Sequence, residues 1–402
     1  MLQQPLPGRR ASDRPASLPL ARFHSLASHP GNSFGPHSRG RRFPRYLGVS
    51  MSSETFSLHQ LGWQPEYAQH LTLADFEAGY PARVMALHRH ALLVMCSRGV
   101  VSVVLPHQLI DTDEGIAVGD WVLVEHEADR VLRLLDRQSV LVRIAAGGDH
   151  QRQSIAANLD VLFVVSSCND DFNASRLERY LALALDAGVT PVIVLTKADS
   201  GHDVAAYVAS AEQLMPGVPV VAVNALDGAS VSQLEPWLAS GRTVAFVGSS
   251  GVGKSTLANR ITGEATQRTS GIREADARGR HTTTAREMFP TPSGAWVIDT
   301  PGMRELRLAA AKPELGAVFG DIEALAAACR FRDCQHDGDV GCAVEAALLA
   351  GVLDTRRLAN YHKLRREALR VQQARHEQRE HSRQFNAMAK QAMRAKRERL
   401  GR

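Results

Sequence analysis

Short apolar runs alternate with helical patterns through the middle of the chain. Nearly continuous apolar runs, which are typical of strands buried on both faces, fall at residues 161–166, 191–195, 218–223, 244–247 and 295–298. Between them, apolar residues recur with a helical period at 174–187, 204–215 and 233–238, and again from Thr256 onward. This alternation predicts an α/β fold with a doubly wound parallel sheet, and such sheets bind their ligands at the carboxyl ends of the strands.

A different pattern, of short β-rich runs separated by turns, precedes this sheet. The candidate strands are 82–87, 91–96, 100–105, 121–126 and 140–144. Five strands in so short a segment favour a small barrel such as an OB-fold. Barrels of this type often bind oligonucleotides on aromatic rings, but Trp121 is the only aromatic residue in these runs. The residues of the barrel therefore do not by themselves indicate RNA binding.

The two ends of the chain differ from its middle. Residues 343–353 and 358 to about 399 have helical patterns, and the second is long, cationic and weakly apolar. We expect the second to be an exposed helix or an arm that becomes ordered on RNA. Residues 1–50 have no apolar period, which predicts a disordered basic extension. Translation from Met51 is an alternative that would remove this extension from the protein. The Arg- and Ser-rich composition also superficially meets the description of an organellar transit peptide, which we favour less.

Charge is unevenly distributed along the 402 residues. Residues 1–50 carry eight arginines against Asp13, and residues 363–402 carry thirteen Lys or Arg against four Glu. The net charge is only +5, so the residues between the two ends are acidic on balance. Basic ends on an acidic body indicate contact with a polyanion such as nucleic acid, and solvated tails are the alternative. No apolar run approaches the roughly 20 residues of a membrane-spanning helix, so we expect no segment that crosses a bilayer and no membrane partner. We also expect a cytoplasmic protein and a monomer.

A glycine-rich loop follows the apolar run 244–247 and precedes a helix. The spacing is that of a phosphate-binding loop, read here as Gly248-Ser249-Ser250-Gly251-Val252-Gly253-Lys254-Ser255-Thr256. Glycines permit a tight turn whose N–H groups face a polyphosphate. Lys254 would contact the β- and γ-phosphates, and the Ser255 hydroxyl would bind Mg²⁺. These residues predict a nucleoside-triphosphate site.

A second motif, at the end of the run 191–195, indicates which base is bound. Thr196-Lys197-Ala198-Asp199 resembles the guanine-recognition motif of GTPases, Asn-Lys-x-Asp. A carboxylate at Asp199 can accept two parallel hydrogen bonds from guanine N1 and the exocyclic amine, which adenine cannot supply. Lys197 would lie along the purine. Thr196 replaces the usual Asn, so contacts by which that Asn braces the phosphate loop are not assured.

The remaining parts of a GTP site follow the phosphate loop. Asp299, after the run 295–298, would hold Mg²⁺ through water, and the N–H of Gly302 would meet the γ-phosphate. The loop Gly279-Arg280-His281-Thr282-Thr283-Thr284 offers a threonine for Mg²⁺, with Thr283 preferred over Thr284. Met303 stands where Ras-like enzymes carry a water-positioning glutamine, which predicts slow intrinsic hydrolysis. His281 is the nearest candidate to replace that glutamine, and a solvent-exposed loop histidine is the alternative.

Three cysteines and a histidine form a compact cluster near the C-terminal end. They are spaced as Cys329-x4-Cys334-x-His336-x5-Cys342. Three thiolates and one imidazole suit tetrahedral Zn²⁺, and four protein ligands leave no open position, so the site would be structural. A redox pair is the alternative, although the chain has no Cys-x-x-Cys.

The order of the nucleotide motifs is unusual. Guanine recognition at 196–199 precedes the phosphate loop at 248–256, whereas ordinary GTPases have the opposite order. A circular permutation of the chain preserves the same sheet. A permuted GTPase domain between a small barrel and this zinc spacing resembles the RsgA (YjeQ) family of bacterial ribosome small-subunit-dependent GTPases, over roughly residues 80–365. The resemblance implies an OB-fold, a zinc-binding domain, and GTP hydrolysis stimulated by the small (30S) subunit during its late maturation.

These interpretations divide the chain into segments. We expect an N-terminal segment at 51–79, the OB-fold at 80–147, the permuted GTPase domain at 148–305, a zinc-binding helical domain at 306–365 and a basic helical tail at 366–402. A GTP-dependent RNA-binding scaffold with incidental hydrolysis is the main alternative function, and Met303 supports it. An ATP-using kinase or ATPase is a third hypothesis, which Asp199 disfavours.

Overall fold

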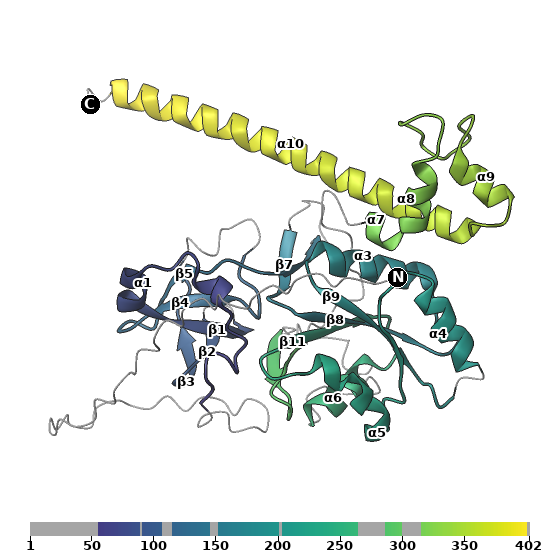
Figure 1. Ribbon diagram of the computed structural model, residues 1–402. Helices are drawn as coiled ribbons and strands as arrows, with labels where there is room; N and C mark the ends of the chain where they lie inside the picture. The colour runs from purple at the N-terminus through teal and green to yellow at the C-terminus, as the bar shows by residue number, and fades with distance from the viewer. Residues whose placement is uncertain are drawn as a thin grey trace, which may run out of the picture. The chain divides into compact units, whose positions relative to one another are not determined.

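All described residues belong to one compact unit, Val49–Arg402. The computed structural model describes residues 55–88, 91–106, 115–144, 152–200, 203–263, 286–299 and 315–399 (Figure 1). The predicted disordered extension at 1–50 lies outside the described residues.

The predicted α/β sheet is confirmed. Its strands lie in the order β10-β9-β8-β11-β13-β12. The first five are parallel, and β12 runs antiparallel to β13. Their bounds are β8 Val161–Ser167, β9 Thr190–Thr196, β10 Val220–Ala222, β11 Thr243–Gly248, β12 Glu287–Pro290 and β13 Trp296–Asp299. The carboxyl ends of β8, β9 and β11 therefore lie at one edge.

Helices pack on both faces of this sheet. Alternate residues of β8 contribute to two separate cores, with Leu162 and Val164 in one and Phe163 and Val165 in the other. The first core includes residues of α3 (Ala174–Asp186) and α4 (Val204–Glu212), and the second those of α5 (Gly228–Val231), the 3-10 helix η2 (Ser232–Trp237) and α6 (Lys254–Thr262). The segment 233–238, predicted as a helix, is thus a 3-10 helix.

Five antiparallel strands form a small barrel, and the sequence predicted four of them. They are β1 Gly79–Leu87, β2 Leu92–Cys96, β3 Gly99–Val103, β4 Trp121–Glu125 and β5 Val131–Leu134. Ladders join β3 to β2, β2 to β1, β1 to β4 and β4 to β5. A parallel bridge between Val104 and Arg130 closes the ring. Its assignment to the OB-fold stays a prediction.

One predicted barrel strand belongs elsewhere. Residues 140–144 do form a strand, β6 (Val140–Ile144), but it pairs with β7 (Arg152–Ala157) in a separate two-stranded sheet. The fifth barrel strand is β5, which the sequence analysis missed. The apolar run at residues 140–144 identifies a strand but not its neighbour, and Leu141 is buried in the core that also contains α3.

The segment before the barrel fixes two tryptophans. It holds the 3-10 helix η1 (Pro65–Ala68) and α1 (Leu73–Ala78). The Trp63 ring lies 4.8 Å from that of Trp121, which is fully buried and so is not available for base stacking. The indole N–H of Trp296 in β13 donates to the Gln60 carbonyl at 2.8 Å. This segment therefore joins the barrel to the main sheet, as does the pairing of β1 with β12.

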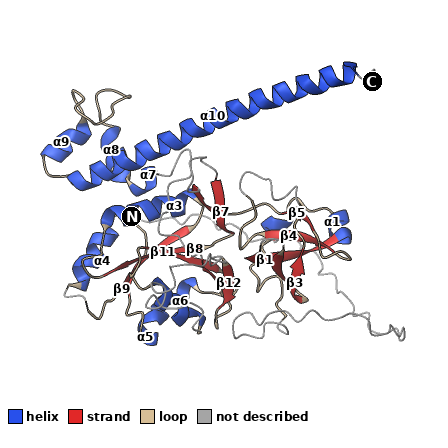
Figure 2. Ribbon diagram, turned by 180° about the vertical axis from the view of Figure 1, so that it is seen from behind, coloured by secondary structure: helices blue, strands red, loops and turns tan. Residues whose placement is uncertain are grey.

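Helices make up the C-terminal part (Figure 2). They are α7 Leu315–Val318, α8 Gly320–Ala326, α9 Ala343–Leu349 and α10 Thr355–Arg399. The two helices predicted here, at 343–353 and 358–399, are confirmed as α9 and α10. None of the helices in the described ranges combines the length and apolarity that a membrane crossing requires.

Candidate functional site

The predicted phosphate-binding loop connects β11 with α6. Gly248 ends the strand with φ +150°, and a Cβ atom there would lie 2.2 Å from the Val165 carbonyl oxygen. Gly253 precedes the helix in a left-handed conformation, φ +93°, that favours glycine. The loop can therefore approach β8 closely and still turn into α6, whose first turn contains Ser255 and Thr256.

The ammonium group of Lys254 lies against the first part of this loop. Its Nζ donates to the Gly248 carbonyl at 2.8 Å and also to the Ser249 carbonyl. A phosphate-loop lysine serves the β- and γ-phosphates, so this end of the loop would face those two phosphates. The same Ser249 accepts a hydrogen bond at its hydroxyl from Arg176 in the first turn of α3.

Thr196 joins the guanine motif to the phosphate loop. Its side chain is fully buried at the end of β9, and its hydroxyl lies 2.5 Å from the Val252 carbonyl oxygen and 3.1 Å from that of Ser166. The single hydroxyl proton is shared between these two carbonyl oxygens, and the contact with that of Val252 is the shorter one. The threonine thus makes a loop-bracing contact although it replaces the usual Asn.

The rest of the guanine motif lies at the same edge of the sheet. Lys197 adopts a left-handed conformation, φ +58°, and the N–H of Ala198 donates to the Val223 carbonyl at 3.3 Å. Asp199 is exposed, so its carboxylate is accessible to a base. Strand β8 alone separates β9 from β11, which brings the two motifs together.

Asp299 ends β13, directly beside the phosphate-loop strand. The parallel register pairs Ala245 with Ile298, so Asp299 follows at the level of Phe246, near the carboxyl end of β11. Its side chain is half-buried. This position suits a carboxylate that holds Mg²⁺ through water. The other residues predicted for hydrolysis and the γ-phosphate, His281, Thr283, Thr284, Gly302 and Met303, lie outside the described residues.

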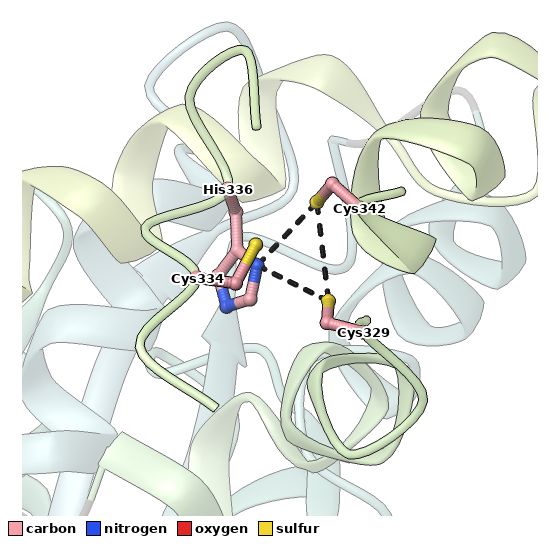
Figure 3. A group of neighbouring side chains, drawn as sticks. All are labelled: Cys329, Cys334, His336 and Cys342. Carbon is pink, nitrogen blue, oxygen red and sulfur yellow. Dashed lines mark hydrogen bonds between the residues drawn. The ribbon is translucent and has the colours of Figure 1, made fainter. Parts of the chain in front are cut away.

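The predicted metal ligands converge on one point (Figure 3). His336 Nδ1 lies 3.6 Å from Cys329 Sγ and 3.5 Å from Cys342 Sγ, and these two sulfurs are 4.0 Å apart. With Cys334, all four ligand atoms lie within 4.8 Å of one another. Ligands of one tetrahedral zinc ion at usual bond lengths would be roughly 3.5–3.8 Å apart. The donor set and its spacing therefore fit a metal ion.

Local hydrogen bonds orient this cluster. The carboxylate of Asp339 accepts from the N–H of Gln335 at 2.7 Å, from that of His336 at 3.0 Å and from the Cys334 thiol at 3.3 Å. Burial raises the pKa of Cys334 to about 12, and burial also lowers the pKa of His336. A neutral imidazole is the form that binds a metal, whereas Cys334 would need the cation to become a thiolate.

Comparisons with known proteins identify the family of the chain. A family model described as RsgA GTPase matches residues 134–309, and one described as 50S ribosome-binding GTPase matches residues 243–380. A protein of Vibrio vulnificus named small ribosomal subunit biogenesis GTPase RsgA 2 is 51% identical over 316 residues, or 79% of this chain and 89% of the relative. The chain belongs to the RsgA family of GTPases. A Mesorhizobium japonicum RsgA is 46% identical over 321 residues, 79% of this chain and 92% of its own.

Two solved structures have folds similar to that of this RsgA-family chain. The structure of YjeQ from Thermotoga maritima has a TM-score of 0.53 at 23% identity and covers 72% of this chain and 98% of its own. The structure of YloQ, described as a circularly permuted GTPase, has a TM-score of 0.51 at 22% identity, covering 72% and 95%. The circular permutation predicted from the motif order is thereby confirmed.

The structure adds one residue to the site of this RsgA-family chain. Arg176 reaches the phosphate loop from a helix 73 positions earlier in the sequence. No motif surrounds it, and its position in the amphipathic segment 174–187 indicates only an exposed helical residue. Sequence reasoning had no signal by which to find it.

Proposed function

We propose that this protein hydrolyses GTP to GDP and phosphate at the edge formed by β8, β9 and β11. The observation that carries the proposal is the contact between Thr196 and Val252, because it holds a guanine-reading motif and a phosphate loop as one unit. Each motif alone could be incidental. Membership of the RsgA GTPase family supports the same activity.

The residues divide the chemistry between them. Lys254 and the loop N–H groups would bind the phosphates, and Asp199 would accept from the guanine edge. Ser255, Thr283 and Asp299 would hold the Mg²⁺ that neutralises charge on the phosphates. His281 would position the attacking water, because Met303 has no hydrogen-bonding group suited to that task.

We propose that the partner is the small ribosomal subunit and that the protein acts in its late maturation, in the cytoplasm, as a monomer. The relatives from Vibrio vulnificus and Mesorhizobium japonicum are named small ribosomal subunit biogenesis GTPases. The thirteen Lys or Arg in residues 363–402 supply the positive charge that contact with rRNA requires.

The proposal assigns one structural Zn²⁺ to Cys329, Cys334, His336 and Cys342. Zinc would tie the loop 329–342 to α9, which Cys342 caps by accepting from the Glu345 N–H. The His362 imidazole lies 3.2 Å from the His336 carbonyl oxygen, so the metal would also fix the start of α10.

Turnover of GTP by the purified full chain, with and without isolated small ribosomal subunits, tests this function. ATP and isolated large subunits are the matched controls. We expect hydrolysis of GTP only, raised strongly by the small subunit. Turnover that the small subunit leaves unchanged, together with GTP-dependent binding to it, would instead support the RNA-binding scaffold that Met303 suggests.

A further inference from the structure

Arg176 contributes a second cation to the phosphate loop. Its Nη1 donates to the Ser249 hydroxyl, while Lys254 Nζ donates to the carbonyl of the same residue. Two positively charged groups thus meet at the β/γ end of the loop. Within the described ranges, no ion pair involves Arg176. Its guanidinium is therefore available to an anion.

The helix that carries Arg176 is held firmly. The Asn173 side chain caps α3 by accepting from the N–H of Arg176 itself, at 2.9 Å. Leu177 and Leu181 are buried against the sheet. The backbone that places the Arg176 side chain beside Ser249 is therefore held in position.

Helix α10 fixes α3 from the other side. Glu178 is fully buried and accepts from Arg356 at 3.1 Å, from Arg357 at 2.9 Å and from Asn360 at 2.5 Å. Arg179, the next residue, pairs with Glu367 at 2.8 Å. The neighbours of Arg176 thus have partners in α10, whereas Arg176 alone is directed to the phosphate loop.

We propose that Arg176 binds the γ-phosphate and stabilises the charge that develops on it during hydrolysis. This inference rests on the proposed GTPase function. Phosphoryl transfer spreads negative charge over the γ-phosphate oxygens, and an arginine supplied from within the same chain is one known means of stabilising it. The planar guanidinium can donate two hydrogen bonds to a phosphate, which an ammonium group cannot match.

Arg176→Ala and Arg176→Lys test the proposal in the full chain. The rate of single-turnover hydrolysis should fall about 100-fold in R176A, which is the usual effect of removing one donor that stabilises charge in the transition state. The rate should fall less in R176K. Affinity for a non-hydrolysable GTP analogue should fall about tenfold, while affinity for GDP stays within about threefold of wild type. Melting temperatures should not change, because the side chain is exposed.

Arg242→Ala is the matched control, since Arg242 is an exposed arginine just before β11, at the opposite end of that strand. It should leave the hydrolysis rate, both nucleotide affinities and the melting temperature unchanged. Equal loss of GDP and analogue binding in R176A would make Arg176 a brace of the loop and overturn the proposal, as would unchanged hydrolysis and binding. If the wild type does not hydrolyse GTP, the proposed function fails, but the ratio of analogue to GDP affinity still tests Arg176.

Discussion

The hydroxyl of Thr196 should control nucleotide affinity through the phosphate loop. Thr196→Val removes that hydroxyl and keeps the size and β-branching of the side chain. The carbonyl oxygens of Val252 and Ser166 then lose a donor in a site that is closed to water. We expect a looser loop whose N–H groups are less well arranged for phosphate.

The size of the effect follows from the burial of this contact. A buried acceptor left without its donor costs about 1–3 kcal/mol. The contact at 2.5 Å is shorter than that to Ser166, so most of this loss should fall on the Val252 side. If half or more of it is expressed in binding, GDP affinity should fall roughly 2- to 140-fold.

Fluorescence titration with a labelled GDP measures this loss, and urea unfolding measures the accompanying change in stability. Thr196→Ser is the matched control, because it keeps the hydroxyl and removes only a methyl group. T196S should bind GDP nearly as well as wild type. Wild-type affinity in T196V, with unchanged stability, would refute the view that this hydroxyl joins the two motifs.

Two further predictions concern the C-terminal part. Glu178→Gln removes the carboxylate that the buried Arg357 and its neighbour Arg356 share. Urea unfolding should show that the free energy of unfolding falls by about 3 kcal/mol. This value is at the lower end for a broken buried pair, because Arg357 keeps its ion pair with Asp321. A loss below about 1 kcal/mol would show that the network contributes little. The purified chain should contain one zinc ion, and His336→Ala should lower its zinc affinity at least about tenfold and expose residues 329–353 to proteolysis. Full metal retention in that variant would contradict the assignment.

The parts of the site that could be predicted from the sequence are those with contiguous motifs. The phosphate loop depends on glycines, a lysine and a serine at fixed spacing, and the metal cluster on four ligands within fourteen residues. In the structure, the phosphate loop and the metal cluster both have the local geometry that these patterns require. Continuous apolar runs also predicted the five parallel strands of the main sheet, because strands buried on both faces need no polar side, whereas the antiparallel β12 was not predicted.

Partners that are distant in sequence could not be predicted. Strand β5 has four residues and is only partly buried, so its pattern was weak, whereas β6 has a strong pattern that does not specify its neighbour. The helical period of α3 places Glu178 in the helix without revealing that arginines some 178 positions later would neutralise it. Arg176 has no signal for the same reason, since only tertiary structure brings it to Ser249.

We propose that one site binds guanine and phosphate together, with Asp199 reading the base. Equilibrium affinities of wild type and Asp199→Asn for GDP and for xanthosine diphosphate test this most directly. Xanthine has a carbonyl in place of the exocyclic amine, so the Asn amide can donate to it. We predict that D199N binds GDP at least about 100-fold more weakly, because two hydrogen bonds to a charged group are lost, and prefers the xanthine nucleotide. Unchanged GDP affinity in D199N would show that the base is read elsewhere and contradict the account.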